Sequence, residues 1–257
     1  MDGQNEAVGG PSTWSIFELP PSIFQLESLA VLGLKACHNL ETLPNDIESL
    51  KNIRWSDLSQ CYLLERMPKR IEKLTNVEVL KGFVIGSSSK SSYQISDLAD
   101  LKNLERLSIH IGSGAIIDEN EFESLKGLSK LEHLIISWGV CGTRYTDDIR
   151  ISLLSNLKKL HLDEDFPEES IPRLLKPTNL PVSLKDLNLA GGKLASMDHG
   201  KLDHSDSCKL EIIHLKYLKH LIVDPEKLQT LFPSSVYVEI KDLQNLLYHE
   251  WIKDEER

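Results

Sequence analysis

The sequence predicts an α/β repeat protein, a curved solenoid with a parallel β-sheet along its concave face. Two observations predict this fold class. Leucine dominates an apolar fraction of 40%, whereas aromatic residues make up only 6% of the 257 residues. Apolar positions also recur in register about every two dozen residues. A core built from one medium-sized side chain at a fixed period is typical of similar units stacked many times.

The strictest repeats follow one another every 24 residues without an insertion. A pattern of apolar residues, one Cys and one Pro in residues 26–47 returns 24 positions later. Counted backwards, residues 19–26 are the tail of an earlier unit. We therefore expect residues 1–18 to be an irregular remnant of a truncated repeat and residues 19–257 to form the repeat domain.

After the third repeat the period becomes looser, but a Leu-x-x-Leu-x-Leu core persists, with Ile or Val at some positions. Its copies lie at 104–109, 131–136, 157–162, 184–189 and, after a longer interval of 34 residues, 218–223. The alternation of apolar residues at 236–240 predicts a closing strand. Together these copies predict eight to nine repeats.

Each repeat predicts a strand followed by a return leg. In the Leu-x-Leu centre both leucines point into the core and the residue between them points outward. In the return leg, Leu-Pro-x-x-Ile-x-x-Leu, the Pro lies near the start of a helical turn whose apolar residues face inward. One unit cannot bury its apolar edge alone, so the copies stack about 4.8 Å apart. The predicted fold is a leucine-rich-repeat solenoid, a horseshoe whose strands lie on the inner side.

Composition limits the partners and the compartment. The formal net charge of −10 argues against a nucleic-acid or anionic membrane surface, because both are polyanions. No run approaches the roughly 18 apolar residues of a membrane span, and the first residues lack the pattern of a secretory signal. Four Cys form no disulfide framework. We expect Cys37 and Cys61, one repeat apart, to be reduced thiols in a cytoplasmic protein.

The sequence nominates no catalytic or cofactor site. No nucleophile, base and oxyanion-stabilising group are indicated together, and the His residues lack a paired-ligand spacing. The segment Gly191-Gly192-Lys193 is followed by Leu194 and lacks the leading Gly of a phosphate-binding loop. We therefore expect a protein that is not an enzyme and binds no nucleotide, metal or other cofactor.

The repeat unit LxxLxxLxLxxCxxLxxLPxxIxxL resembles the C-terminal repeats of plant intracellular nucleotide-binding leucine-rich-repeat disease-resistance proteins of the coiled-coil class. Cys37-His-Asn-Leu40-Glu-Thr-Leu43-Pro44 and Cys61-Tyr-Leu-Leu64-Glu-Arg-Met67-Pro68 carry the resemblance. It implies a cytoplasmic domain that recognises a pathogen effector or a guarded host protein and helps to hold the receptor inactive. An adjoining domain that binds ADP or ATP is a further implied partner.

The alternative function is a substrate adaptor of a ubiquitin ligase. Such adaptors also use Cys-bearing leucine-rich repeats, but they reach the ligase through an N-terminal helical module. Residues 1–18 are too short to supply that module.

The candidate partner-binding residues are those expected to point outward from the strands, since Trp and Arg are enriched where interfaces are strongest. They are Arg54, Trp55, Asp57, Arg106, Ser108, His133, Trp138, Lys159, His161, Asp163, Asp186, Asn188 and His220. The alternative for Trp55 is a ring that lies flat on neighbouring repeats without a ligand. The segments 86–96 and 190–209 are predicted loops, which either take part in recognition or are tolerated insertions.

Overall fold

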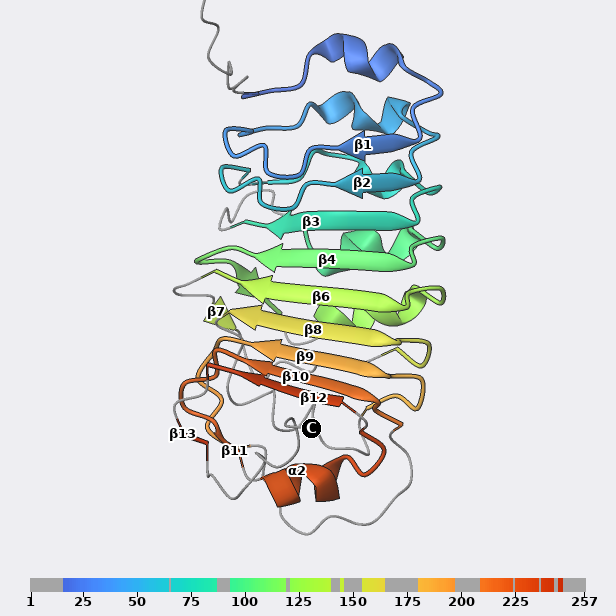
Figure 1. Ribbon diagram of the computed structural model, residues 1–257. Helices are drawn as coiled ribbons and strands as arrows, with labels where there is room; N and C mark the ends of the chain where they lie inside the picture. Colours follow the sequence, from blue (N-terminus) through green and yellow to red (C-terminus); the bar gives the residue numbers. More distant parts are fainter. Residues whose placement is uncertain are drawn as a thin grey trace, which may run out of the picture.

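The strands of successive repeats pair in parallel into one open sheet (Figure 1). The computed structural model describes residues 16–64, 66–86, 93–118, 121–139, 144–145, 154–164, 180–196, 209–223, 225–235, 237–242 and 245–246. Within these residues the sheet contains, in spatial order, β1 (Val31–Gly33), β2 (Trp55–Asp57), β3 (Val79–Ile85), β4 (Arg106–Ile111), β6 (His133–Trp138), β8 (Lys159–Glu164), β9 (Asp186–Ala190), β10 (Ile212–Lys216) and β12 (Tyr237–Lys241). The predicted solenoid and its closing strand are confirmed.

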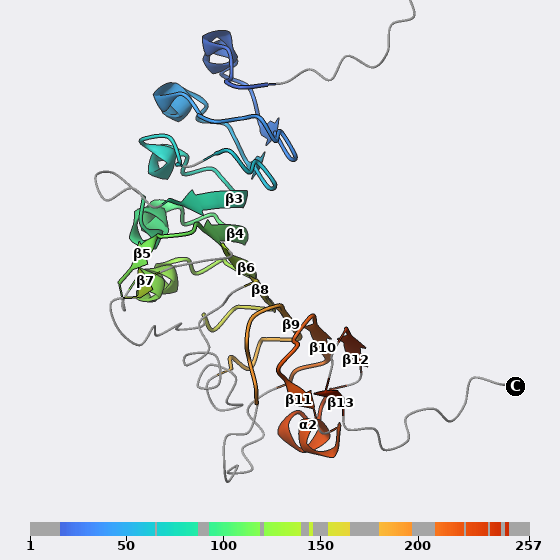
Figure 2. The same cartoon turned by 90° about the vertical axis from the view of Figure 1, so that its left-hand side faces the viewer.

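Short helical turns return the chain from one strand to the next. They are 3₁₀ helices at Pro21–Gln25, Asn45–Ser49, Ile71–Lys73, Ile95–Asp100 and Glu121–Gly127. Pro20 and Pro44 stand at the N-terminal caps of the first two. A 3₁₀ helix rises about 2 Å per residue and so covers the width of the stack with few residues. The stack bends with the strands on its inner side and these turns on its outer side (Figure 2).

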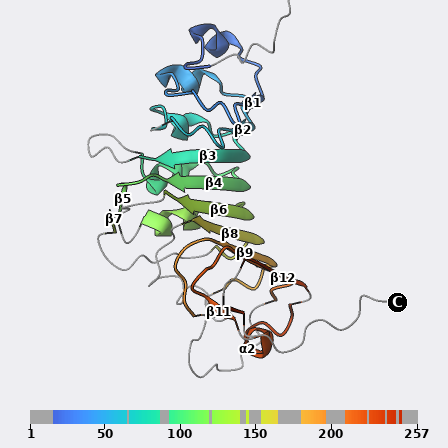
Figure 3. The ribbon, with the colours of Figure 1, turned by 60° about the vertical axis from the view of Figure 1, so that its left-hand side comes forward.

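Smaller elements lie beside the main sheet. β5 (Ile116–Ile117) pairs with β7 (Arg144–Tyr145), and β11 (Ile222–Val223) pairs with β13 (Asn245–Leu246). The helix α2 (Pro225–Leu231) lies at the C-terminal end of the stack (Figure 3). These elements lie outside the row of strands that forms the inner face.

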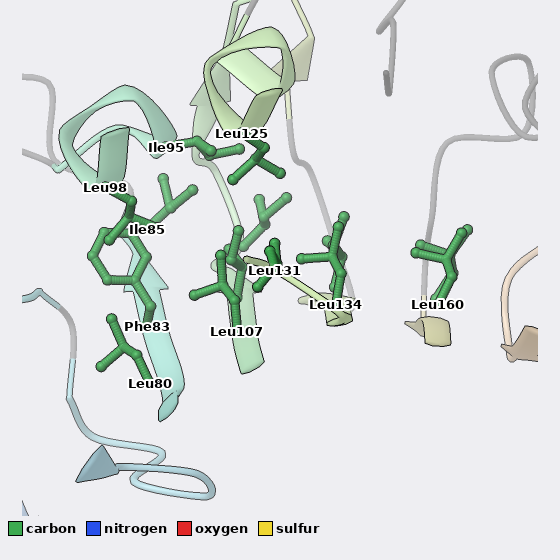
Figure 4. Packing of buried hydrophobic residues seen from close by; sticks show 14 of the residues in the cluster. Leu80, Phe83, Ile85, Ile95, Leu98, Leu107, Leu125, Leu131, Leu134 and Leu160 are labelled. Atoms are coloured by element: carbon green, nitrogen blue, oxygen red, sulfur yellow. The ribbon is translucent and has the colours of Figure 1, made fainter. Parts of the chain in front are cut away.

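A column of leucines holds successive strands together. Leu80, Leu107, Leu134 and Leu160 pair in register on four neighbouring strands, and each is at most 1% exposed. Leu98 and Leu125 approach this column from the return legs (Figure 4). Burying one such side chain contributes about 1.5 to 3 kcal/mol, so the stacked repeats share one continuous core.

The same column contains a polar residue near its N-terminal end. Ser56 pairs with Leu32 of β1 and Leu80 of β3 and is 4% exposed. The ladder therefore connects Leu32 to Leu107 through successive parallel strands, as the repeat pattern predicts. Nothing in the structure explains a hydroxyl group at this core position.

A β-bulge in β3 marks the change from short to long repeats. Leu80 pairs with Leu107 and Phe83 with Ile109, so two residues lie between the paired positions on β3 and only one lies between them on β4. Gly82 in the bulge has φ of +76°, and a Cβ there would lie 2.5 Å from the carbonyl carbon of Leu58. Strands before the bulge have three residues and those after it have five or six. The longer period is therefore used to lengthen the strands.

Replacing Gly82 by Ala should lower the free energy of unfolding by about 2 kcal/mol or more, because it adds overpacking to a left-handed backbone. Urea unfolding followed by circular dichroism measures this loss. Gly33→Ala is the matched control, since its Cβ would meet the Trp55 ring at an ordinary 3.5 Å. Equal losses in the two variants would contradict the role assigned to the bulge.

Side-chain amides in the turns before the strands tie neighbouring repeats together. Each amide donates to a backbone carbonyl one repeat earlier. The bonds run from Asn52 to Glu27, from Asn76 to Lys51, from Asn103 to Thr75 and from Asn156 to Ser129. Lys130 occupies the same position in its repeat and donates to the side-chain oxygen of Asn103 at 2.8 Å. This Asn ladder satisfies backbone carbonyls that the turns leave without a partner.

We expect Asn103→Ala to lower the free energy of unfolding by about 1 kcal/mol, the usual net value of a hydrogen bond. The variant removes the bond to Thr75 and the acceptor for Lys130. Thr75→Ala serves as the control because it keeps the accepting carbonyl. A urea midpoint for Asn103→Ala that equals that of the parent chain would argue against the Asn ladder.

The prediction for the last full repeat is wrong. Its strand in the main sheet is Ile212–Lys216, so the core positions are Leu210, Ile213 and Leu215. The predicted core at 218–223 instead follows this strand and leads into β11. The interval from the preceding repeat is thus 26 residues and not 34. The error arose because Ile213 replaces a leucine while the leucines of the next turn imitate the pattern.

The division at residues 18 and 19 stays a prediction. Glu18 forms a parallel bridge to Thr42, and residues 1–15 lie outside the described part of the chain. The central parts of the predicted loops at 86–96 and 190–209 also lie outside it.

Candidate interaction surface

The first residues of the strands form a continuous row across the inner face. We call this set the entry row: Val31, Trp55, Val79, Arg106, His133, Lys159, Asp186, Ile212 and Tyr237. Each pairs in register with its neighbours, and each is half-buried or exposed. The parallel register therefore brings side chains from nine repeats into one line.

A second row lies two residues further along the strands. This middle row contains Asp57, Lys81, Ser108, Ile135, His161, Asn188, His214 and Glu239. The part from Asp57 to His161 lines a groove with a volume of about 830 Å³. The inner face is thus hollowed, and it presents polar and apolar side chains above a core that is almost entirely apolar.

Trp55 faces the N-terminal part of this surface. Val31 and Val79 flank it in the entry row, and the ammonium group of Lys81 lies 6.0 Å from its ring centroid. Arg54 immediately precedes the strand and forms an ion pair with Glu78, yet 65% of its side chain remains exposed. Both residues are accessible to a partner, although contact with one stays a prediction.

Asp57 is more buried than a typical partner-facing residue. Its side chain is 6% exposed, and one oxygen accepts a hydrogen bond from the Ser59 backbone amide at 3.0 Å. The other oxygen lies 4.0 Å from Nζ of Lys81. Asp57 therefore holds the turn after β2 and positions Lys81 at the groove.

The expectation that Trp138 faces a partner is wrong. The strand β6 alternates between half-buried and buried residues along its whole length, and Trp138 falls on the buried side with 0% exposure. It pairs in register with Ile111 of β4. Two residues of the strand extend beyond the Leu-x-Leu centre, so the alternation carries the ring into the core.

Three basic side chains occupy the middle of the entry row. Arg106, His133 and Lys159 follow one another on β4, β6 and β8. Burial lowers the pKa of His133, and the charges of Arg106 and Lys159 lower it further. At neutral pH the positive charge of this part of the row therefore comes from Arg106 and Lys159.

His110 and Ser137 lie further along β4 and β6. Nδ1 of His110 is 3.0 Å from the Ser137 hydroxyl. Burial lowers the pKa of this His, which favours the neutral ring that can share a hydrogen bond with a hydroxyl group.

A network of charges covers the C-terminal strands. Nζ of Lys159 donates to Asp186 at 2.9 Å, which links β8 to β9. Glu239 accepts from Lys216 at 2.7 Å and contacts Nδ1 of His214 at 2.6 Å, which links β10 to β12. Hydrogen bonds from Lys216 and His214 lower the pKa of Glu239. These contacts keep the C-terminal part of the face polar and ordered.

Two neighbouring residues of the middle row have buried polar atoms without a hydrogen bond to any described residue. They are Nε2 of His161 and Oδ1 of Asn188, which pair in register on β8 and β9. Burial lowers the pKa of His161. Nε2 of His161 also lies 3.9 Å from a carboxylate oxygen of Asp163, the next outward residue of β8.

The structure places His220 off the main sheet. It is exposed in the turn after β10, so its assignment to the inner face is wrong. The outward positions of this repeat belong to His214 and Lys216. Sequence reasoning missed both because it placed the strand eight residues too late; the Ile-x-Leu alternation at Ile213 and Leu215 was the available signal.

The two Cys of the short repeats are free thiols, as predicted. Cys61 donates to the carbonyl oxygen of Leu34 at 3.1 Å, and burial raises the pKa of its thiol. Within the described ranges, no three His, Cys, Asp or Glu side chains are grouped as metal ligands. None of the helices in these ranges is long and apolar enough to cross a membrane.

A family model described as "Leucine-rich repeat region" matches residues 12–204. The chain belongs to the leucine-rich-repeat family. It is also 32% identical over 227 residues to Disease resistance RPP13-like protein 4 of Arabidopsis thaliana. This match covers 86% of the chain but only 26% of the relative, so the chain spans about a quarter of that protein's length. The resemblance to repeats of plant disease-resistance proteins is confirmed.

Solved leucine-rich-repeat and related structures show weaker likeness. Internalin C2 of Listeria monocytogenes is 17% identical with a TM-score of 0.44, and the match covers 88% of the chain and 77% of the internalin. A leucine-rich-repeat protein of Leptospira interrogans is 20% identical with a TM-score of 0.43, with coverages of 90% and 58%.

The lowered pKa values of His110, His133 and His161 predict a pH-dependent stability of the leucine-rich-repeat sheet. Below the ordinary value of 6.5 and above the folded values, the unfolded chain binds more protons than the folded chain. The contribution of these three His residues to the free energy of unfolding should therefore be complete above pH 6.5. The free energy of unfolding should fall as the pH decreases through this window. Urea titrations at pH 7.5 and 5.5 test the direction.

Replacing all three His by Gln should flatten this dependence between pH 7.5 and 5.5. A parent chain that becomes more stable on acidification would show that the sign is wrong.

Proposed function

We propose that this chain is the recognition domain of a plant-type intracellular immune receptor and that its inner face binds a pathogen effector or a guarded host protein. The similarity to Disease resistance RPP13-like protein 4 supports the receptor class. Leucine-rich-repeat domains are generally protein-binding scaffolds. The name of the relative favours this function over a ubiquitin-ligase adaptor.

The observation that carries the proposal is the open inner face. Nine strands about 4.8 Å apart present rows roughly 40 Å long, enough for the interface of about 800 Å² per partner in a stable complex. The face offers a large aromatic ring at Trp55 and exposed charged side chains at Arg106 and Lys159. These groups fit a protein partner that excludes water from the face.

The proposal includes the context of a longer receptor. In it, a nucleotide-binding domain adjoins the repeats, and the protein works in the cytoplasm. The acidic residues at 163–165 and 168–169 are a candidate docking site for that domain; Asp163 and Glu164 end β8, and the others lie outside the described residues.

A steric block of the inner face should abolish recognition whatever the chemistry of the partner. Ser108→Arg and Asn188→Arg each place a long side chain in the middle row, at β4 and β9. A partner is first identified by screening the chain against pathogen effectors and host proteins. Its dissociation constant, measured by calorimetry, should rise at least tenfold in each variant, equivalent to about 1.4 kcal/mol.

Ser129→Arg is the matched control, because Ser129 is exposed in the turn before β6 and outside the sheet. Circular dichroism verifies that all three variants remain folded. Unchanged affinity in the Ser108 and Asn188 variants would remove the inner face as the recognition surface.

A further inference from the structure

The entry row changes character abruptly between β3 and β4. Its first three members, Val31, Trp55 and Val79, are apolar, and Val31 is 58% exposed. The next three, on β4, β6 and β8, are the basic residues described above. An apolar patch thus adjoins a basic patch along one row of the inner face, on a chain whose net charge is −10.

The basic patch remains accessible to an anionic partner. Arg106 forms no ion pair with any described residue and is exposed. Lys159 shares its charge with Asp186, yet 55% of its side chain is exposed. His133 lies between them and adds hydrogen-bonding capacity at the centre of the patch.

Acidic residues immediately before the strands are mostly neutralised. Arg54 pairs with Glu78, and Lys158 pairs with Glu132 at 2.6 Å. Glu105 has no such cation among the described residues and limits the basic patch at the entrance of β4. Arg106 therefore faces the inner side without an ion-pair partner among the described residues, and Lys159 presents an exposed ammonium group beside Asp186.

The row also sets the spacing that a partner must match. Strands lie about 4.8 Å apart, so the Trp55 strand is about 10 Å from the Arg106 strand and about 19 Å from the Lys159 strand. A peptide in the extended polyproline II conformation advances about 3.1 Å per residue and turns every third side chain to the same side. Carboxylates opposite these two strands would follow an apolar side chain on Trp55 by about three and about six residues.

We propose that the entry row from β1 to β8 binds an extended acidic segment of a partner protein, anchored by one apolar side chain on Val31, Trp55 and Val79. Carboxylates of the segment lie against Arg106, His133 and Lys159. This assignment names the class of partner for the surface under Proposed function and rests on that function. Trp and Arg are the residue types that most often dominate interfaces, because each buries a large area and keeps a polar handle.

Three labelled peptides test the chemistry. The first is a fluorescein-labelled peptide of about twelve residues with one Phe and with Glu three and six positions later, in a Gly and Ser background. The second has Lys in place of both Glu, and the third has Ala in place of Phe. Fluorescence anisotropy with the full chain should show the first peptide binding at least tenfold more tightly than either of the others.

Charge reversal then locates the binding site. Arg106→Glu and Lys159→Glu should each weaken binding of the Glu peptide at least tenfold, and Lys159→Glu should bind the Lys peptide more tightly than the parent chain does. Lys126→Glu is the matched control: its side chain is also 55% exposed and also pairs with a carboxylate, Glu123, but it belongs to a return leg. Circular dichroism verifies the fold of each variant.

Equal binding of the three peptides, no binding of any of them, or an equal loss in the Lys126 variant would overturn the proposal. Its failure is distinct from a failure of the proposed function. If steric block at Ser108 stops capture of an immune partner while charge reversal at Lys159 does not, the acidic segment is wrong and the recognition face stands. If the Glu peptide binds as expected but no effector or host protein does, the surface chemistry stands and the immune function falls.

Discussion

The whole architecture depends on apolar contact between repeats that cannot fold separately. A strand of three to seven residues followed by a short turn has no interior of its own. Its leucines become buried only when the next repeat covers them, as Leu107 is covered by Leu80 and Leu134. The stability of such a stack is close to a sum of nearest-neighbour terms. The inner face is therefore rigid where repeats continue on both sides.

The same contact determines which positions remain available for recognition. Side chains of a strand alternate between its two faces. When a leucine points into the core, the residues next to it in the strand therefore point outward. Backbone pairing and the Asn ladder then keep those neighbours in register from repeat to repeat. Variation at outward positions alters the surface without disturbing the core. The entry row illustrates this freedom, since it passes from valine to arginine to tyrosine above an almost unbroken line of aliphatic residues.

The sequence predicted the architecture well because each repeat places apolar residues at the same core positions, so that the core contacts repeat with a fixed period. The parallel sheet, the order of the first seven strands and the closing strand all followed from residue spacing. The site was harder to predict, because outward positions carry no period of their own. Trp138 was misplaced since nothing in the sequence states how far a strand continues beyond its Leu-x-Leu centre. His214 was missed since Ile213 weakened the pattern in a repeat whose following turn is itself rich in leucine.

Some charged side chains form ion pairs between adjacent repeats, whereas others have no such pair among the described residues and can bind a partner. At the strand entrances, Arg54 with Glu78 and Lys158 with Glu132 join adjacent repeats, as do the Asn side chains. Exposed pairs of this kind contribute about 0 to 1 kcal/mol each, so they chiefly order the turns. Arg106 lies one residue further in and joins no described residue in an ion pair. Its charge helps to lower the pKa of Glu132 only after the larger contribution of Lys158, so removal of Arg106 should affect binding more than folding.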